Sequence, residues 1–280
     1  MSATSNSRPN AYDLFTNYGR ARDTFKDPNV FGATVVPAIC YVVWLMRRRP
    51  SDRLWRPAAF AAFMMPALLI SFSRGAWISL AVALLILGVV AFTRTRRRTD
   101  CTRLWMFSAA GVAGLAAMLV AVMQVPEVRG PLRERASLRQ GYDVGPEGRF
   151  GGQQKAIGLM LDTPLGIGPF TCREVYHHEE VHNVYITQSC NAGWLGAFAY
   201  IASVLLTLAV GMRRGWRPGP LQGFLAVATA TFAGVVVEGM VINSDHWRHF
   251  FIVMGLIWGC ADARTAPDRR AARREGDDDR

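Results

Sequence analysis

The sequence predicts an all-α polytopic membrane protein with about seven transmembrane helices and one large outward-facing loop that carries short interfacial helices. Hydrophobic residues make up 51% of the 280 residues, and the mean hydropathy is positive, at +0.14. They are grouped in blocks, most of them close to the ~20 residues that a spanning helix needs. In addition, clusters of arginine follow alternate blocks, a pattern typical of cytoplasmic connections.

Seven blocks are predicted to span the membrane, and the first and last of them are short. They cover residues 31–46, 55–72, 76–92, 104–125, 192–212, 221–237 and 250–260. The chain therefore divides into five parts. These are an outward-facing segment 1–30, four spans in 31–125, the large loop 126–191 with the site, three spans in 192–262, and a charged tail 263–280 that we expect to be disordered in the cytoplasm.

Arginine sets the orientation of these spans. The clusters lie at 47–56, 94–103, 213–217 and 264–274, and the positive-inside rule places all four in the cytoplasm. Because topology accounts for the net charge of +11, no nucleic-acid partner is expected. Segment 1–30 then faces outward without a signal-peptide pattern, so we expect either further helices upstream, in a longer protein, or an unusually short relative.

The five cysteines show no paired spacing, so neither a disulfide framework nor a zinc ribbon is predicted. Cys172 and Cys190 share the long loop. A disulfide between them remains open if that loop faces an oxidising compartment.

The stretch 145–191 is the only long run between hydrophobic blocks that is dense in ionisable residues, so we expect the chemistry there. Within it, Phe150, Ile157, Met160 and Leu161 fall on one side of a helical wheel. They predict a short helix at the membrane surface that ends at Thr163. A second helix is expected from about residue 183 to 212.

Two arginines are candidate anion-binding residues. Arg74 lies between two blocks with almost no loop, and a charge in that place is a site candidate in a membrane protein, although it could also snorkel to lipid headgroups. Arg149 begins the predicted surface helix, where it could simply be solvated. Together, two outward-facing guanidiniums suit a phosphate or pyrophosphate on a lipid.

His182 is the candidate general base. It stands at the amino-terminal end of the predicted helix, where the helix dipole disfavours the imidazolium and leaves a neutral ring able to accept a proton from a hydroxyl. The alternative is a histidine that only caps or bonds within the loop. His178, Glu179 and His182 also fit H-E-x-x-H, the zinc-protease pattern, but they precede the helix rather than lie inside it.

The last outward turn carries Asp245, Trp247 and Arg248, with Glu238 at the end of the preceding span. Asp245 and Arg248 are predicted to form an ion pair, and Trp247 to anchor the turn at the membrane interface. We expect a supporting role for this turn rather than direct catalysis.

Short motifs occur in a fixed order around the large loop. They are F-K-D-P-N-V-F-G at 25–32, S-F-S-R-G at 71–75, G-R-F at 148–150, P-L-G-I-G at 164–168, H-N-V-Y at 182–185, G-W-L-G at 193–196 and D-H-W-R at 245–248. In this order they resemble the O-antigen ligase and polymerase superfamily of bacterial envelope glycosyltransferases, over residues 18–260. Members of that family carry several more helices before the D-P-N segment.

The resemblance implies a class C-like glycosyltransferase of the bacterial inner membrane that needs neither a metal nor another cofactor. It implies transfer of a glycan from undecaprenyl pyrophosphate, at the periplasmic face, to lipid A core, a growing glycan or a protein, with membrane lipids around it. The family residues fall on Arg74, Arg149 and His182 as catalytic groups, with Arg74, Arg149 and Asn183 binding substrate and Asp27, Asn29, Asp245 and Arg248 in support.

Two alternatives from other functional classes remain at this stage. One is a membrane zinc protease, based on the H-E-x-x-H match. The other is a non-catalytic polysaccharide-export subunit, based on the short length of the chain.

Overall fold

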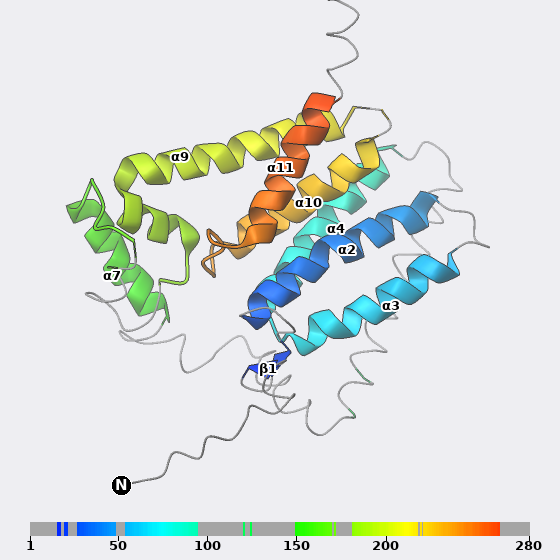
Figure 1. The fold of residues 1–280 in the computed structure, drawn as a ribbon, viewed down its shortest axis with the longest axis horizontal. Helices are drawn as coiled ribbons and strands as arrows, with labels where there is room; N and C mark the ends of the chain where they lie inside the picture. The colour runs from blue at the N-terminus through cyan, green and yellow to red at the C-terminus, as the bar shows by residue number, and fades with distance from the viewer. Residues whose placement is uncertain are drawn as a thin grey trace, which may run out of the picture.

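The computed structural model of the chain is built from helices (Figure 1). It describes residues 16–17, 20–21, 27–48, 54–94, 120, 124, 149–169, 171, 181–217, 219 and 221–263. The helices are α2 (Pro28–Arg48), α3 (Trp55–Ile70), α4 (Arg74–Arg94), α7 (Arg149–Asp162), α9 (Val184–Gly215), α10 (Gln222–Glu238) and α11 (Arg248–Ala263). Within the described ranges, the strands are β1 (Thr16–Asn17) and β2 (Arg20–Ala21), which pair antiparallel.

The helical class is confirmed. Six of the seven predicted blocks coincide with α2, α3, α4, α9, α10 and α11, and the block 104–125 falls almost wholly outside the described residues. Of the helices that the structure describes, α2, α4 and α9 are long and apolar enough to cross a membrane, whereas α3 and α10 are apolar but shorter. The prediction of a short first span was wrong, because α2 has 21 residues and begins at Pro28.

Helix α10 lies at the centre of the bundle and packs against α2, α4, α9 and α11. Most of its residues are buried, and many are alanine, glycine or threonine. A side chain added at Gly234 would lie 2.5 Å from the backbone oxygen of Ser79 on α4, so the two helices touch through their backbones. Small residues allow such close approach, which is how helices associate in lipid.

The starts of α2 and α4 lie at one end of the bundle, and the ends of these two helices lie at the other (Figure 1). At one end, Gly32 near the start of α2 lies against Ser71 and Ser73, and Gly75 at the start of α4 lies against Glu238. At the other end, Arg47 Nη2 donates a hydrogen bond of 3.0 Å to the carbonyl oxygen of Ala91. The arginine-bearing ends of α2 and α4 are therefore neighbours, away from the end where Arg74 lies.

Candidate functional site

The turn between α3 and α4 is fixed by its two serines. Ser71 Oγ donates to the carbonyl oxygen of Leu68 (2.6 Å) and accepts from the Ser73 backbone N–H (3.3 Å). Ser73 Oγ accepts from the Ala76 backbone N–H (3.3 Å), which caps the start of α4. The chain passes through a positive φ of 50° at Phe72 to make the turn. As a result, Arg74 becomes the first residue of α4.

Arg74 is half-buried, whereas the three residues before it are buried. The backbone N–H groups at a helix start and the helix dipole both favour an anion, and the guanidinium fork adds paired donors. The next residue, Gly75, has no side chain, and a Cβ there would lie 2.6 Å from Glu238 Oε1. Gly75 of the S-R-G motif thus leaves the space that the Glu238 side chain occupies.

The D-P-N motif starts α2 beside this turn. Asp27 Oδ1 accepts from the Asn29 backbone N–H at 2.7 Å, and Pro28 takes the first helical position, where its missing N–H costs nothing. One turn later Gly32 packs on the serines: a Cβ at Gly32 would meet Ser71 Oγ at 2.7 Å. Asp27 therefore has a structural role next to the Arg74 turn.

His182 lies where the sequence predicted, immediately before a helix. Asn183 is the N-cap of α9, and its Oδ1 accepts from the backbone N–H groups of Tyr185 (3.0 Å) and Ile186 (3.3 Å). The carbonyl oxygen of His182 accepts from Gln153 Nε2 on α7 at 3.1 Å. These bonds fix the backbone of His182 between α7 and α9, while its side chain stays half-buried.

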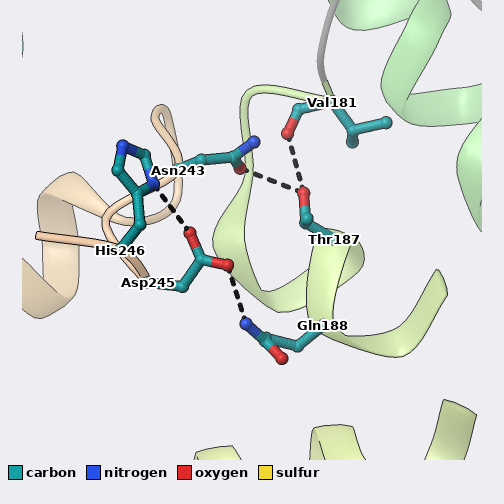
Figure 2. A network of polar contacts seen from close by, with 6 residues as sticks. All are labelled: Val181, Thr187, Gln188, Asn243, Asp245 and His246. Atoms are coloured by element: carbon teal, nitrogen blue, oxygen red, sulfur yellow. Dashed lines mark hydrogen bonds and ion pairs between the residues drawn. The ribbon is translucent and has the colours of Figure 1, made fainter. Parts of the chain in front are cut away.

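Polar contacts join the start of α9 to the turn between α10 and α11 (Figure 2). Asp245 lies between two partners: its Oδ2 accepts from Gln188 Nε2 at 2.8 Å, and its Oδ1 lies 3.2 Å from His246 Nδ1. Thr187 Oγ1 donates to the carbonyl oxygen of Val181 (2.9 Å) and contacts Asn243 Oδ1 (3.0 Å). The turn thus supports the helix that follows His182.

Two predictions about this turn were wrong. Asp245 does not pair with Arg248, because its oxygens contact Gln188 and His246 while Arg248 begins α11 with an exposed side chain. Trp247 is not an interface anchor: it is 2% exposed and packs in the apolar cluster of α9, α10 and α11 with Phe250 and Phe232. Turn residues become core when the next helix folds back over them, which local polarity does not reveal.

Helix α9 is kinked at Gly193, which has a φ of 68° and a ψ of −170° (Figure 1). The predicted single helix from about residue 183 is therefore two segments. The P-L-G-I-G turn fills the break, because Ile167 N–H donates to the Cys190 carbonyl (2.8 Å) and Trp194 N–H to the Pro164 carbonyl (2.9 Å). The P-L-G-I-G and G-W-L-G motifs are thus two sides of one backbone contact.

Replacing Gly193 by alanine is expected to destabilise the protein by roughly 3 kcal/mol or more, which the thermal unfolding midpoint in detergent would report. The new Cβ would overlap the backbone of Pro164 and Leu165, and the positive φ disfavours any side chain. Gly255→Ala on α11 is the control, since a Cβ there meets nothing within 4 Å. Equal unfolding midpoints for the two variants would contradict the kink contact.

Helix α7 begins at Arg149 and ends at Asp162, as predicted. Its Ala156 and Leu159 are buried in a cluster with Cys190, whereas Ile157 and Leu161 are exposed. The apolar residues of α7 therefore do not form one exposed side: some pack against the rest of the protein, and others are exposed. Cys190 Sγ donates to the Ala156 carbonyl at 3.6 Å. Cys172 lies outside the described residues, so the disulfide stays a prediction.

Several predicted site groups also lie outside the described part of the chain. For Arg149 only the backbone is described, and His178 and Glu179 are not. Within the described ranges, no three histidine, cysteine, aspartate or glutamate side chains are grouped so as to hold a metal ion. This leaves the zinc alternative untested.

Arg74 and His182 share one end of the bundle, although more than a hundred residues separate them. Gly75 packs on Glu238, the last residue of α10; the next residue, Gly239, accepts from the Val184 N–H at 2.9 Å, and Val184 follows the His182-Asn183 pair. Sequence reasoning placed Glu238 in a supporting group and did not identify this bridging position. The signal was a single acidic residue closing an otherwise apolar block.

Comparison with known proteins gives one family. The family described as O-antigen ligase matches residues 59–201, about half of the chain. The match runs from α3 through the kink of α9 and includes Arg74, Arg149 and His182. No curated protein matches the chain.

Proposed function

The chain belongs to the O-antigen ligase family, and from this we propose that it transfers a glycan from undecaprenyl pyrophosphate to an acceptor hydroxyl at the periplasmic face of the bacterial inner membrane. Family membership indicates a membrane-embedded enzyme of the glycosyltransferase or ligase type in polysaccharide biosynthesis. The three long apolar helices agree with a place in the membrane. The lipid donor and the site residues are the parts that we propose.

The observation that supports the proposal is that Gly75, next to Arg74, and Val184, close to His182, both contact the end of α10, which puts the two residues at one end of the bundle. A guanidinium at a helix start can bind a pyrophosphate, and an imidazole at another helix start can accept a proton. A displacement in which a hydroxyl attacks and a pyrophosphate leaves needs a base and a cationic group, and these two residues can provide them.

The reaction is a direct displacement at the anomeric carbon. The acceptor oxygen forms a bond to that carbon as the bond to the pyrophosphate oxygen breaks, and its proton passes to His182. Arg74, with Arg149, stabilises the charge that develops on the pyrophosphate. Because the proposed reaction is a single displacement, the anomeric configuration is inverted. No metal is required in this mechanism.

The remaining predicted site residues are proposed to hold Arg74 and His182 in place or to contact substrate. Asn183 caps α9 with its side-chain oxygen, and we propose that it also contacts substrate. Asp27 and Asn29 start α2 beside the Arg74 turn. Asp245 supports α9 through Gln188, and Arg248 begins α11 in the same region. The acceptor, whether lipid A core, a growing glycan or a protein, decides between ligase and polymerase.

The direct test is transfer of labelled glycan from undecaprenyl pyrophosphate in membranes that contain the protein, with and without a chelator. We expect transfer that survives the chelator and gives an inverted linkage. A protein that transfers no glycan to any of the three acceptor classes would refute the proposal and favour a non-catalytic export subunit.

The topology is expected to place the site outside. Reporter fusions at Arg98 and Arg214 should score cytoplasmic, and fusions at Gly141 and Ser244 periplasmic, because the arginine clusters stay on the cytoplasmic side. A cytoplasmic score at Gly141 would separate the loop from its lipid-linked substrate and contradict the mechanism.

A further inference from the structure

Glu238 is a buried acid at the point where the elements of the site meet. It is the last residue of α10 and 0% exposed, and neither carboxyl oxygen has a hydrogen-bond partner among the residues that the structure describes. Its carboxyl group lies against Gly75: a Cβ on Gly75 would be 2.6 Å from Oε1 and 3.1 Å from Cδ. Buried polar groups are nearly always paired, so an unpaired carboxyl in a native bundle calls for a functional explanation.

Burial without a partner favours the uncharged acid. An ionised carboxylate in this place would lose its water without gaining an ion pair from any described residue, which is strongly disfavoured. The ionisable residues that the surrounding elements bring to this end of the bundle come from α2, α4, α9, α11 and the α10–α11 turn. Among the described residues they are Asp27, Arg74, His182, Tyr185, Tyr200, Asp245, His246, Arg248 and His249.

The charge of Glu238 matters because of the residue next to Gly75. Arg74 and the start of α4 provide the positive potential that would attract a pyrophosphate. A carboxylate packed on Gly75 would offset that potential and compete for the guanidinium, whereas a neutral acid of the same shape would not. The same side chain fills the space that glycine leaves, so it also fixes where the turn lies.

We propose that Glu238 is a positioning residue of the pyrophosphate site: as an uncharged acid packed on Gly75, it holds the turn that presents Arg74 without neutralising it. This rests on the proposed function. In this role Glu238 acts on substrate binding only through the backbone of the Ser-Arg-Gly turn.

The first test compares Glu238→Gln with Glu238→Ala in the glycan-transfer assay. Glutamine has the shape of the neutral acid, so it should keep the donor KM within about threefold, while alanine should raise it about tenfold or more and change kcat less. With wild type, donor KM should rise as the pH increases, because the acid ionises. With Glu238→Gln that rise should disappear.

These measurements can overturn the inference. If Glu238→Gln is as impaired as Glu238→Ala, or if its donor KM follows the same pH dependence as wild type, the neutral-acid role is wrong. Normal donor KM in Glu238→Ala would also exclude it. Should Glu238→Ala fail to fold, the pH comparison between wild type and Glu238→Gln decides by itself.

The second test is a double-mutant cycle between Gly75 and Glu238. Gly75→Ala should lower transfer about tenfold or more, since the new Cβ collides with the carboxyl group. Adding Glu238→Ala should remove the collision and restore part of that loss. Gly88→Ala, on the same helix but with nothing within 4 Å of its Cβ, is the matched control and should be active.

Both thermal unfolding and glycan transfer are measured for each variant of the cycle. The results therefore distinguish a failure of the proposed function from a failure of the role proposed for Glu238. If wild-type protein transfers no glycan, the proposed function fails. If wild type transfers glycan but the two substitutions act additively in both readouts, the contact between Gly75 and Glu238 does not position the turn and the inference fails.

Discussion

Replacing His182 by alanine is expected to lower turnover by roughly a hundredfold or more while donor-lipid binding stays nearly unchanged. That is the usual contribution of a positioned general base. The backbone of the site should survive, because Gln153 bonds to the carbonyl of residue 182 and the Asn183 side chain caps α9. Transfer of labelled glycan and binding of the donor lipid are the two measurements.

Three comparisons make this result specific. His178→Ala and Glu179→Gln should be mild if His182 is a base, but as damaging as His182→Ala if the three residues form a zinc site. Chelator should have no effect. Asn183→Ala removes the cap and should cost about 1 kcal/mol of stability, which the thermal unfolding midpoint would report. Equal loss in the three His and Glu variants, or activity abolished by chelator, would overturn the assignment.

Arg74→Lys is expected to lower glycan transfer by about a hundredfold although the charge is kept. A guanidinium at the start of α4 can form two parallel bonds to pyrophosphate oxygens, whereas an ammonium acts as a point charge and loses one transition-state donor. Arg149→Lys should also lose much of the activity. The measurement is kcat/KM for the lipid donor.

Arg213→Lys is the matched control, because Arg213 lies in the last turn of α9 and is exposed. It should transfer glycan at the wild-type rate. Full activity in both Arg74→Lys and Arg149→Lys would support the simpler reading in which the two arginines only reach for headgroups or water.

The order and type of the helices could be predicted because membrane insertion is a local property. A block of apolar residues near the length of a bilayer forms a helix whatever surrounds it, since its backbone groups have no other partners in lipid. The start of α7 at Arg149 and the start of a helix near residue 183 were equally local, as they depend on residues within one turn.

The candidate site could be predicted only as separate residues. Arg74 was found from its place between two apolar blocks and His182 from its place before a helix. Arg74 and His182 lie at the same end of the bundle because of the way in which α4 and α9 pack against α10. That packing was not visible in the sequence, because α10 is mostly apolar and its few polar residues do not form a polar face that would indicate its neighbours.

The sequence by itself determined which segments are helical, where several of them start, and which family the motifs resemble. Only the tertiary structure decided that Gly193 breaks α9 against Pro164, that Trp247 is core, and that Glu238 is buried against Gly75. The physical reason is the distance along the sequence over which each interaction acts. Hydrophobicity and capping act within a few residues along the chain, whereas backbone contacts between helices depend on residues far apart in sequence that meet only when the bundle packs.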